Sequence, residues 1–148
     1  SPDRASGEYM VDGLLERGRP ILINAGDDAH FAFPGDRFGG WIEVWAETLD
    51  PPALLAALRS GAYYSTQGPR IERLEVDGER LHVSTSPVHA IALGGAGDRW
   101  LDATSVLDEN GGLVSEGTFE LSAFRESYCR VTVLDADRRR AWSNPIWP

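Results

Sequence analysis

The sequence has little cysteine, few basic residues and no long apolar run. Its single cysteine among 148 residues, Cys129, allows neither an internal disulfide nor a zinc site built from cysteines. We expect Cys129 to be a small apolar residue on a strand, and the lack of disulfides favours a cytoplasmic protein. No stretch is long and apolar enough to cross a bilayer.

Basic residues are outnumbered by acidic ones, 14 against 23, which gives a net charge of −9. This balance argues against nucleic acid and against an anionic membrane surface as partners, because both are bound through Lys and Arg. It leaves a small phosphate ester open as a substrate, because bound metal ions can supply positive charge locally.

Residues 21–30 (ILINAGDDAH) predict a short buried strand that runs out into two carboxylates and an imidazole. The continuous apolar run at 21–23 is typical of a strand covered on both faces, as in a parallel sheet or barrel. On an extended chain Asp28 and His30 point to one side and Asp27 to the other. Carboxylate oxygen and neutral imidazole nitrogen both bind divalent metals, so Asp28 and His30 are the candidate metal ligands. Asp27 is either a partner that orients a ligand or an ordinary loop residue.

Two helices flank this segment. The first is expected over residues 6–18, with Ser6 as its cap and an apolar face that ends near Leu15. The second begins after Asp50 with Pro51 in its first turn and stops at Gly61. Between them, Arg37 lies in a glycine-rich loop, where it either faces a bound anion of the substrate or is simply solvated.

The pattern changes near residue 70, after a turn predicted over residues 63–69 (YYSTQGP). Beyond it, short alternating segments surround a hairpin signal at Asp77-Gly78, and residues 128–134 predict a clear strand. Such spacing is typical of an antiparallel β-sandwich. His82 and His89 have no partner at metal-ligand spacing, so neither is assigned to a site.

Residues 26–31 (GDDAHF) resemble the last metal-binding motif of the PHP superfamily of metal-dependent phosphoesterases. The likeness continues through residues 40–46 (GWIEVWA), 53–61 (ALLAALRSG), 63–69 and 139–146 (RRAWSNPI). It extends over most of the chain and is closest to the branch that includes carbaryl-hydrolase-like members.

The resemblance implies a seven-stranded βα barrel with up to three divalent metals, such as Mn, Zn or Fe, in which Asp28 and His30 are the last ligand pair. The early His-x-His motif and the middle Glu and His ligands of the family are absent here. A full βα barrel usually needs about 250 residues. We therefore expect a C-terminal portion of such a hydrolase, in which missing segments or another chain supply the other ligands.

The predicted fold class is α/β plus β. Residues 1–69 are expected to form the last βα segment of an incomplete PHP-like barrel, and residues 70–148 an antiparallel β-sandwich. The expected partners are a small phosphate ester, the rest of the barrel or a second copy of the chain in a homo-oligomer. The alternative is a non-catalytic β-sandwich module for ligand binding or interdomain packing, because five tryptophans offer aromatic faces for a binding surface.

Overall fold

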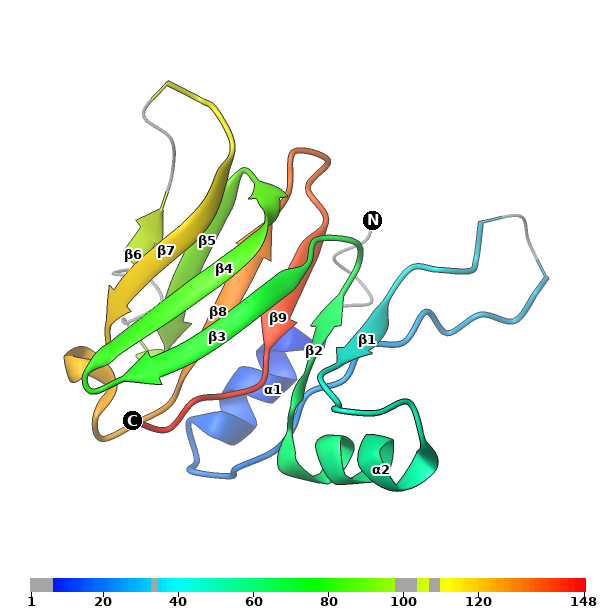
Figure 1. Cartoon of the computed structure of the whole chain (residues 1–148), viewed down its shortest axis with the longest axis horizontal. Helices are drawn as coiled ribbons and strands as arrows, with labels where there is room; N and C mark the ends of the chain where they lie inside the picture. The colour runs from blue at the N-terminus through cyan, green and yellow to red at the C-terminus, as the bar shows by residue number, and fades with distance from the viewer. Residues whose placement is uncertain (1–6, 33–34, 98–103, 107–109) are drawn as a thin grey trace.

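The computed structural model of the chain describes residues 7–32, 35–97, 104–106 and 110–148 (Figure 1). Within these residues the chain is mostly β. Its elements, in chain order, are α1 (Glu8–Leu15), β1 (Trp41–Val44), α2 (Pro51–Ser60), β2 (Tyr63–Thr66), β3 (Ile71–Asp77), β4 (Arg80–Val88), β5 (Ala90–Gly95), β6 (Thr104–Val106), β7 (Val114–Glu120), the 3-10 helix η3 (Ser122–Phe124), β8 (Cys129–Leu134) and β9 (Arg140–Ser143). Trp100, one of the five tryptophans, lies outside the described residues. Neither α1 nor α2 is long and apolar enough to cross a membrane.

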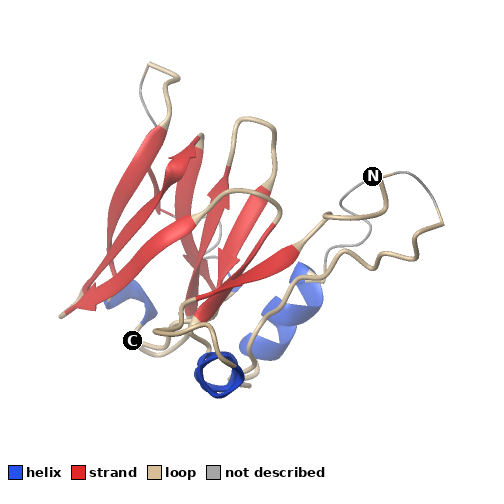
Figure 2. Ribbon diagram, turned by 45° about the vertical axis from the view of Figure 1, so that its right-hand side comes forward, coloured by secondary structure: helices blue, strands red, loops and turns tan. Residues whose placement is uncertain are grey.

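The strands form two antiparallel sheets, an arrangement compatible with the predicted sandwich. One sheet has six strands in the order β1-β2-β9-β8-β5-β6, and the other has three in the order β3-β4-β7. Figure 1 shows the three-stranded sheet in front of the larger one, and Figure 2 shows both helices outside the space between them. Strands β1 and β2 lie to one side of the smaller sheet in this view.

The core lies between the two sheets. Residues that alternate along β4, such as Leu81 and Val83, are buried from one side, and Ile91 and Leu93 of β5 are buried from the other. This alternation is what a strand with one covered face requires. The buried cluster consists of Tyr64, Ile71, Leu81, Val83, Val88, Ile91, Leu93, Phe119, Leu121, Phe124, Cys129, Val131, Val133 and Ala141.

Two connections within this part of the chain are tight. The hairpin predicted at Asp77-Gly78 joins β3 to β4, and Gly78 has the positive φ of 59° that such a turn needs. His89 alone separates β4 from β5, so the chain passes from the smaller sheet to the larger within one residue. The His89 amide donates to the Leu134 carbonyl at 2.8 Å, which anchors this corner to β8.

Strand β2 corrects the prediction of a turn over residues 63–69. Its four residues are all buried, and it pairs with β1 on one side and with β9 on the other. Segments from either side of residue 70 therefore share one sheet. The polar side chains of Ser65 and Thr66 concealed this strand in the sequence. In the fold they hydrogen bond to the carbonyls of Ile23 and Pro69.

The strand predicted at residues 21–23 was wrong, because this segment is not part of either sheet. Strand β2, which the segment contacts through Ser65, already has both edges paired and offers it no edge. Side chains hold the segment instead: the Ile23 amide donates to Asn144 Oδ1 at 2.7 Å, and the Ile23 carbonyl accepts from Ser65 Oγ at 3.2 Å. Leu22 is 44% exposed.

Helix α1 confirms the central part of the predicted first helix. Ser6, its expected cap, lies outside the described residues, and Gly7 occupies the cap position without a side-chain hydrogen bond. Of the predicted apolar face, which is made of Met10, Val11, Leu14 and Leu15, only Leu15 is buried, and Met10 is exposed.

Helix α2 follows the predicted boundaries closely. Asp50 Oδ1 accepts from the Ala53 amide at 3.0 Å, Pro51 begins the helix, and Gly61 ends it with a φ of 78°. Its only buried residue is Ala57, so α2 leaves much of its leucine-rich surface open.

Candidate functional site

The predicted ligands lie on a loop that leaves the body of the molecule before β1 (Figure 1). Its two ends meet at the base: a Cβ on Gly40 would lie 3.4 Å from Ala25 Cβ and from the Gly26 carbonyl oxygen. This contact at the base makes residues 26–32 and 35–39 the two sides of a projecting arm.

Two carboxylates fix the shape of this arm. Asp27 accepts from the Ala29 amide at 3.3 Å and from the Phe38 amide at 2.7 Å, and so ties the two sides of the arm together. Asp36 Oδ2 accepts from the amides of His30 and Ala32, each at 3.2 Å. Of the two alternatives for Asp27, these contacts favour a residue that shapes the loop.

Asp28 and His30 do not lie on an extended chain, which corrects the alternation expected from the sequence. Asp28 has a φ of 51° and Phe31 a φ of 56°, so the backbone turns sharply at both positions. Asp tolerates this left-handed conformation better than most residues. Both Asp28 and His30 are exposed.

The ring of His30 has a defined tautomer. Its Nδ1 lies 2.6 Å from the backbone carbonyl oxygen of Asp28, which can only accept, so Nδ1 carries the proton. In the neutral ring Nε2 then has the lone pair that a metal binds. A hydrogen bond from the other ring nitrogen to a carbonyl is the usual support of a metal-binding histidine.

Arg37, the predicted anion contact, lies on the same arm and is exposed. Its Cζ is 5.7 Å from the centre of the Phe31 ring, within the range of a cation–π contact. This contact places the exposed guanidinium beside Phe31, the residue that follows His30 in the chain.

The donor set fits a divalent metal only in part. Asp28 and His30 give two ligands, whereas catalytic zinc sites typically use three from the protein. Across residues 7–32, 35–97, 104–106 and 110–148, no group of three or more His, Cys, Asp or Glu side chains is arranged to hold a metal. His82 contacts Thr118 Oγ1 across β4 and β7 at 3.1 Å, and so belongs to the sheet surface.

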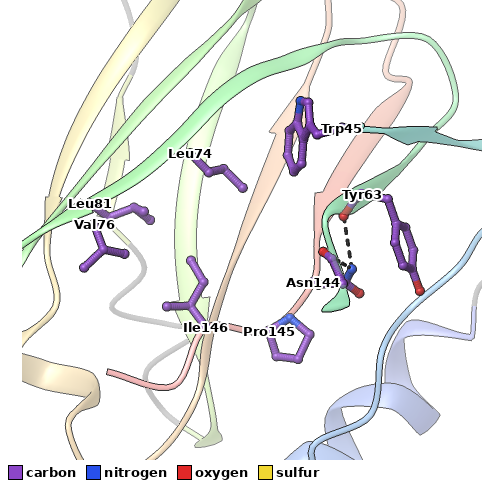
Figure 3. A pocket seen from close by; sticks show the side chains of 9 residues that line it. Trp45, Tyr63, Leu74, Val76, Leu81, Asn144, Pro145 and Ile146 are labelled. Carbon is purple, nitrogen blue, oxygen red and sulfur yellow. Dashed lines mark hydrogen bonds between the residues drawn. The ribbon is translucent and has the colours of Figure 1, made fainter. Parts of the chain in front are cut away.

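A second feature, which the sequence reasoning missed, is an apolar pocket of about 190 Å³ at the open end of the sandwich (Figure 3). It is lined by Trp45, Gly61, Tyr63, Leu74, Val76, Leu81, Asn144, Pro145 and Ile146. The Asn144 amide donates to the carbonyls of Gly61 and Tyr63, each at 3.0 Å, so its N–H groups are occupied. The lining comes from five separate segments of the chain, so no local sequence pattern could predict it.

Cys129 is buried on β8, as predicted. Burial raises the pKa of its thiol to about 12, so the thiolate needed for nucleophilic or metal chemistry is not formed at neutral pH.

Comparisons with models of protein families, with curated proteins and with solved structures find no match for this chain.

Proposed function

We propose that this chain is the C-terminal portion of a PHP-type metal-dependent hydrolase that acts on small phosphate esters. In this proposal residues 1–69 close the barrel of the complete enzyme, and residues 70–148 form its appended β-sandwich domain, to whose larger sheet β1 and β2 of the first part are added. Asp28 and His30 are the last ligand pair of the metal site, and the setting is cytoplasmic. The support is the resemblance of residues 26–31 and of the segments that follow them.

The observation that carries the proposal is the hydrogen bond from His30 Nδ1 to the Asp28 carbonyl. It fixes the imidazole with Nε2 as the free ligand atom and holds the two proposed ligands in one turn of the chain. Asp27 and Asp36 fasten this turn through four backbone amides, so the backbone that carries the pair is held in one conformation. Pre-arrangement is what a weak, two-ligand site needs to contribute to a larger one.

Each residue then has a defined part in hydrolysis. When bound, divalent metal supplies a water of lowered pKa and polarises the phosphoryl oxygen. Asp28 contributes a carboxylate ligand, and His30 contributes Nε2 while Nδ1 keeps the ring in place. Arg37 pairs with a phosphoryl oxygen through the N–H groups of its exposed guanidinium.

The remaining ligands come from another segment or another chain. Exposed apolar side chains on and near the arm support a missing neighbour: Phe31 is 76% exposed, Phe38 81% and Leu22 44%. Side chains of this kind gather where a partner surface covers them. Either the rest of the barrel or a second copy of the chain fills this role in the proposal.

A titration with Mn²⁺, followed by electron paramagnetic resonance, tests the ligand pair directly. We expect weak saturable binding that His30→Ala and Asp28→Asn each abolish, whereas His82→Ala, which changes a histidine on the sheet surface, leaves it intact. The same 148 residues should not hydrolyse p-nitrophenyl phosphate at a measurable rate. Equal binding by all three variants, or rapid metal-dependent turnover by the 148 residues that His30→Ala abolishes, contradicts the proposal.

The apolar pocket favours a second candidate, a sandwich module that binds a ligand without chemistry. Ligand sites are mostly apolar and concave, and Trp45 offers an aromatic wall that stacks on Tyr64 at 5.2 Å between ring centres. If Mn²⁺ does not bind at Asp28 and His30 but the tryptophan fluorescence of Trp45 responds to small apolar ligands, this second candidate takes the lead.

A further inference from the structure

The outer face of the six-stranded sheet concentrates positive charge under helix α1. Arg130 of β8 points to this face, and its side chain is only 3% exposed although the chain as a whole is acidic. Arg140 of the neighbouring strand β9 stands opposite Leu134, on the same face as Arg130, and shares a carboxylate partner with it, Glu8. A buried guanidinium is costly unless its donors are matched by acceptors.

The carboxylate of Asp12 in α1 occupies the centre of this cluster, in the position that a bound oxyanion would take. Arg130 Nε donates to Asp12 Oδ1 at 3.1 Å and Nη2 donates to Oδ2 at 3.0 Å, a two-pronged contact. The Tyr128 hydroxyl donates to the same Oδ1 at 3.1 Å. The carboxylate therefore receives three hydrogen bonds from two side chains of the protein body.

Glu8, one turn earlier in α1, brings a second carboxylate to the same cluster. Its two oxygens accept from Arg130 Nη2 and Arg140 Nη1, each at 3.3 Å. Together the two carboxylates supply about the charge of a phosphate dianion, and they meet two guanidinium groups whose forked geometry also suits phosphate.

The same face carries a donor that has no acceptor in the described parts of the chain. Trp142 stands opposite Thr132 on adjacent strands, and Thr132 accepts from Arg130, so Trp142 shares the face of the cluster. The indole Nε1 of Trp142 is buried, and no group among the described residues pairs with it. An indole N–H can only donate, so this face has more donors than α1 and its surroundings satisfy.

These polar contacts and the burial of Leu15 attach helix α1 to the sheet. Leu15 is its only buried residue, and Tyr9 and Met10 are 90% and 72% exposed. A helix of eight residues is not stable alone in water, so its structure depends on this attachment. A competing anion that satisfies the same donors would release it.

We propose that Arg130, Arg140 and Tyr128 form a phosphate-binding site on the outer face of the six-stranded sheet, and that α1 is its exchangeable intramolecular occupant. Phosphate in the site replaces the carboxylates of Asp12 and Glu8 and frees α1 from the sheet. The site shares no residue with the Asp28–His30 arm, so the two proposals can be tested independently.

The test compares inorganic phosphate binding, by calorimetry at constant ionic strength, in the whole chain and in the double variant Glu8→Gln/Asp12→Asn. Removing the competing carboxylates should tighten phosphate binding by about tenfold or more, because the site no longer has to open first. A control in which two exposed glutamates far from the cluster in sequence are changed, Glu47→Gln/Glu126→Gln, has the same net charge as the double variant and should bind as weakly as the unmodified chain. O-phospho-L-serine, titrated in parallel, distinguishes a free phosphate from a phosphate group on a larger molecule.

Two further measurements keep the proposal falsifiable if the double variant folds poorly. In the unmodified chain, phosphate should speed amide hydrogen exchange of residues 8–15 relative to chloride at equal ionic strength. In the double variant, Arg140→Gln should weaken phosphate binding, and the partial exposure of Arg140 makes this change tolerable. Unchanged exchange in α1, or equal phosphate affinity in the double variant and its control, overturns the proposal.

Discussion

Apolar side chains are buried between the two sheets but are largely exposed in the segment formed by residues 7–62. Between the sheets, Phe119 is 1% exposed and Ile91 is fully buried. In the segment, Leu49 is 94% exposed and Leu55 51%, and each of the two helices buries one residue. The sandwich therefore completes its own core, whereas the segment leaves apolar surface uncovered.

The two regions are also held by different forces. Burial of apolar area stabilises the sandwich, and this contribution is large and non-directional. Specific polar contacts fasten the segment: Asp12 with Arg130 at one point, and Asn144 with Ile23 and Gly61 at another. We infer that the sandwich carries most of the stability, and that the segment is positioned for contact with something else.

Replacing one phenylalanine in each region tests most directly whether the two regions differ in their contribution to stability. Phe119→Ala should lower the free energy of unfolding by about 3 to 5 kcal/mol, because it leaves a cavity between the sheets. Phe38→Ala, in the exposed arm, should change it by no more than about 0.5 kcal/mol. Urea unfolding followed by tryptophan fluorescence measures both, and similar losses would refute the contrast.

Adding a methyl group to a glycine should show the same asymmetry on a smaller scale. A Cβ on Gly95 would lie 2.3 Å from the Tyr128 carbonyl oxygen, which the pairing of β5 with β8 prevents from moving. Gly95→Ala should therefore cost about 2 to 3 kcal/mol. Gly26→Ala meets nothing within 4 Å and should be close to neutral. Thermal unfolding of the two variants checks this, and a neutral Gly95→Ala would be the contrary result.

Asn144→Ala tests whether the two regions can be separated, because Asn144 fastens one to the other. Three hydrogen bonds disappear, to Ile23, Gly61 and Tyr63, and we expect a loss of roughly 1 to 2 kcal/mol since the partly buried backbone groups can regain some contact with water. Hydrogen exchange should speed up at residues 21–23 while β8 stays protected. Asn24→Ala, an exposed neighbour, is the control, and loss of protection throughout β8 would mean that the two regions are not separable.

The smallest effect is expected at the cap of α2. Hydrogen bonds from the Thr48 hydroxyl and the Ala53 amide hold the pKa of Asp50 below its usual value of 3.8. The stabilisation is therefore fully present above the unfolded value and is lost as the pH falls through the lower folded value. Asp50→Asn should remove this pH dependence while keeping a cap. The melting temperature, recorded at steps between about pH 6 and pH 2, should then fall less in the variant than in the unmodified chain. An equal fall in both would show that Asp50 is not the group responsible.

Local signals predicted the parts of the fold that local chemistry decides. Asp50, Pro51 and Gly61 marked α2, and Asp77-Gly78 marked a hairpin, because caps and turns are determined by a few adjacent residues. Residues 21–23 misled for the opposite reason: an apolar run predicts burial, but whether it becomes a strand depends on a free partner edge. Strand β2 was missed because its pairing with β9 depends on residues about eighty positions later.

In the candidate sites too, residues close together in the sequence could be predicted, whereas contacts between distant residues could not. The sequence alone nominated Asp28, His30 and Arg37, and the structure adds the hydrogen bond that sets the His30 tautomer. The sequence could not reveal the cluster of Arg130 with Asp12, because the two residues are 118 positions apart. The apolar pocket was equally hidden, since its walls meet only after the sheets form.

The single residue between β4 and β5 has a consequence for how this protein can vary. Because side chains alternate with a period of two, one inserted residue beside His89 would rotate Ile91 and Leu93 to the outer face while β4 kept its place. The one-residue connection therefore fixes which side chains of β5 face the core relative to those of β4. Length variation among natural or engineered versions should therefore be tolerated in the arm before β1 and rejected at this corner.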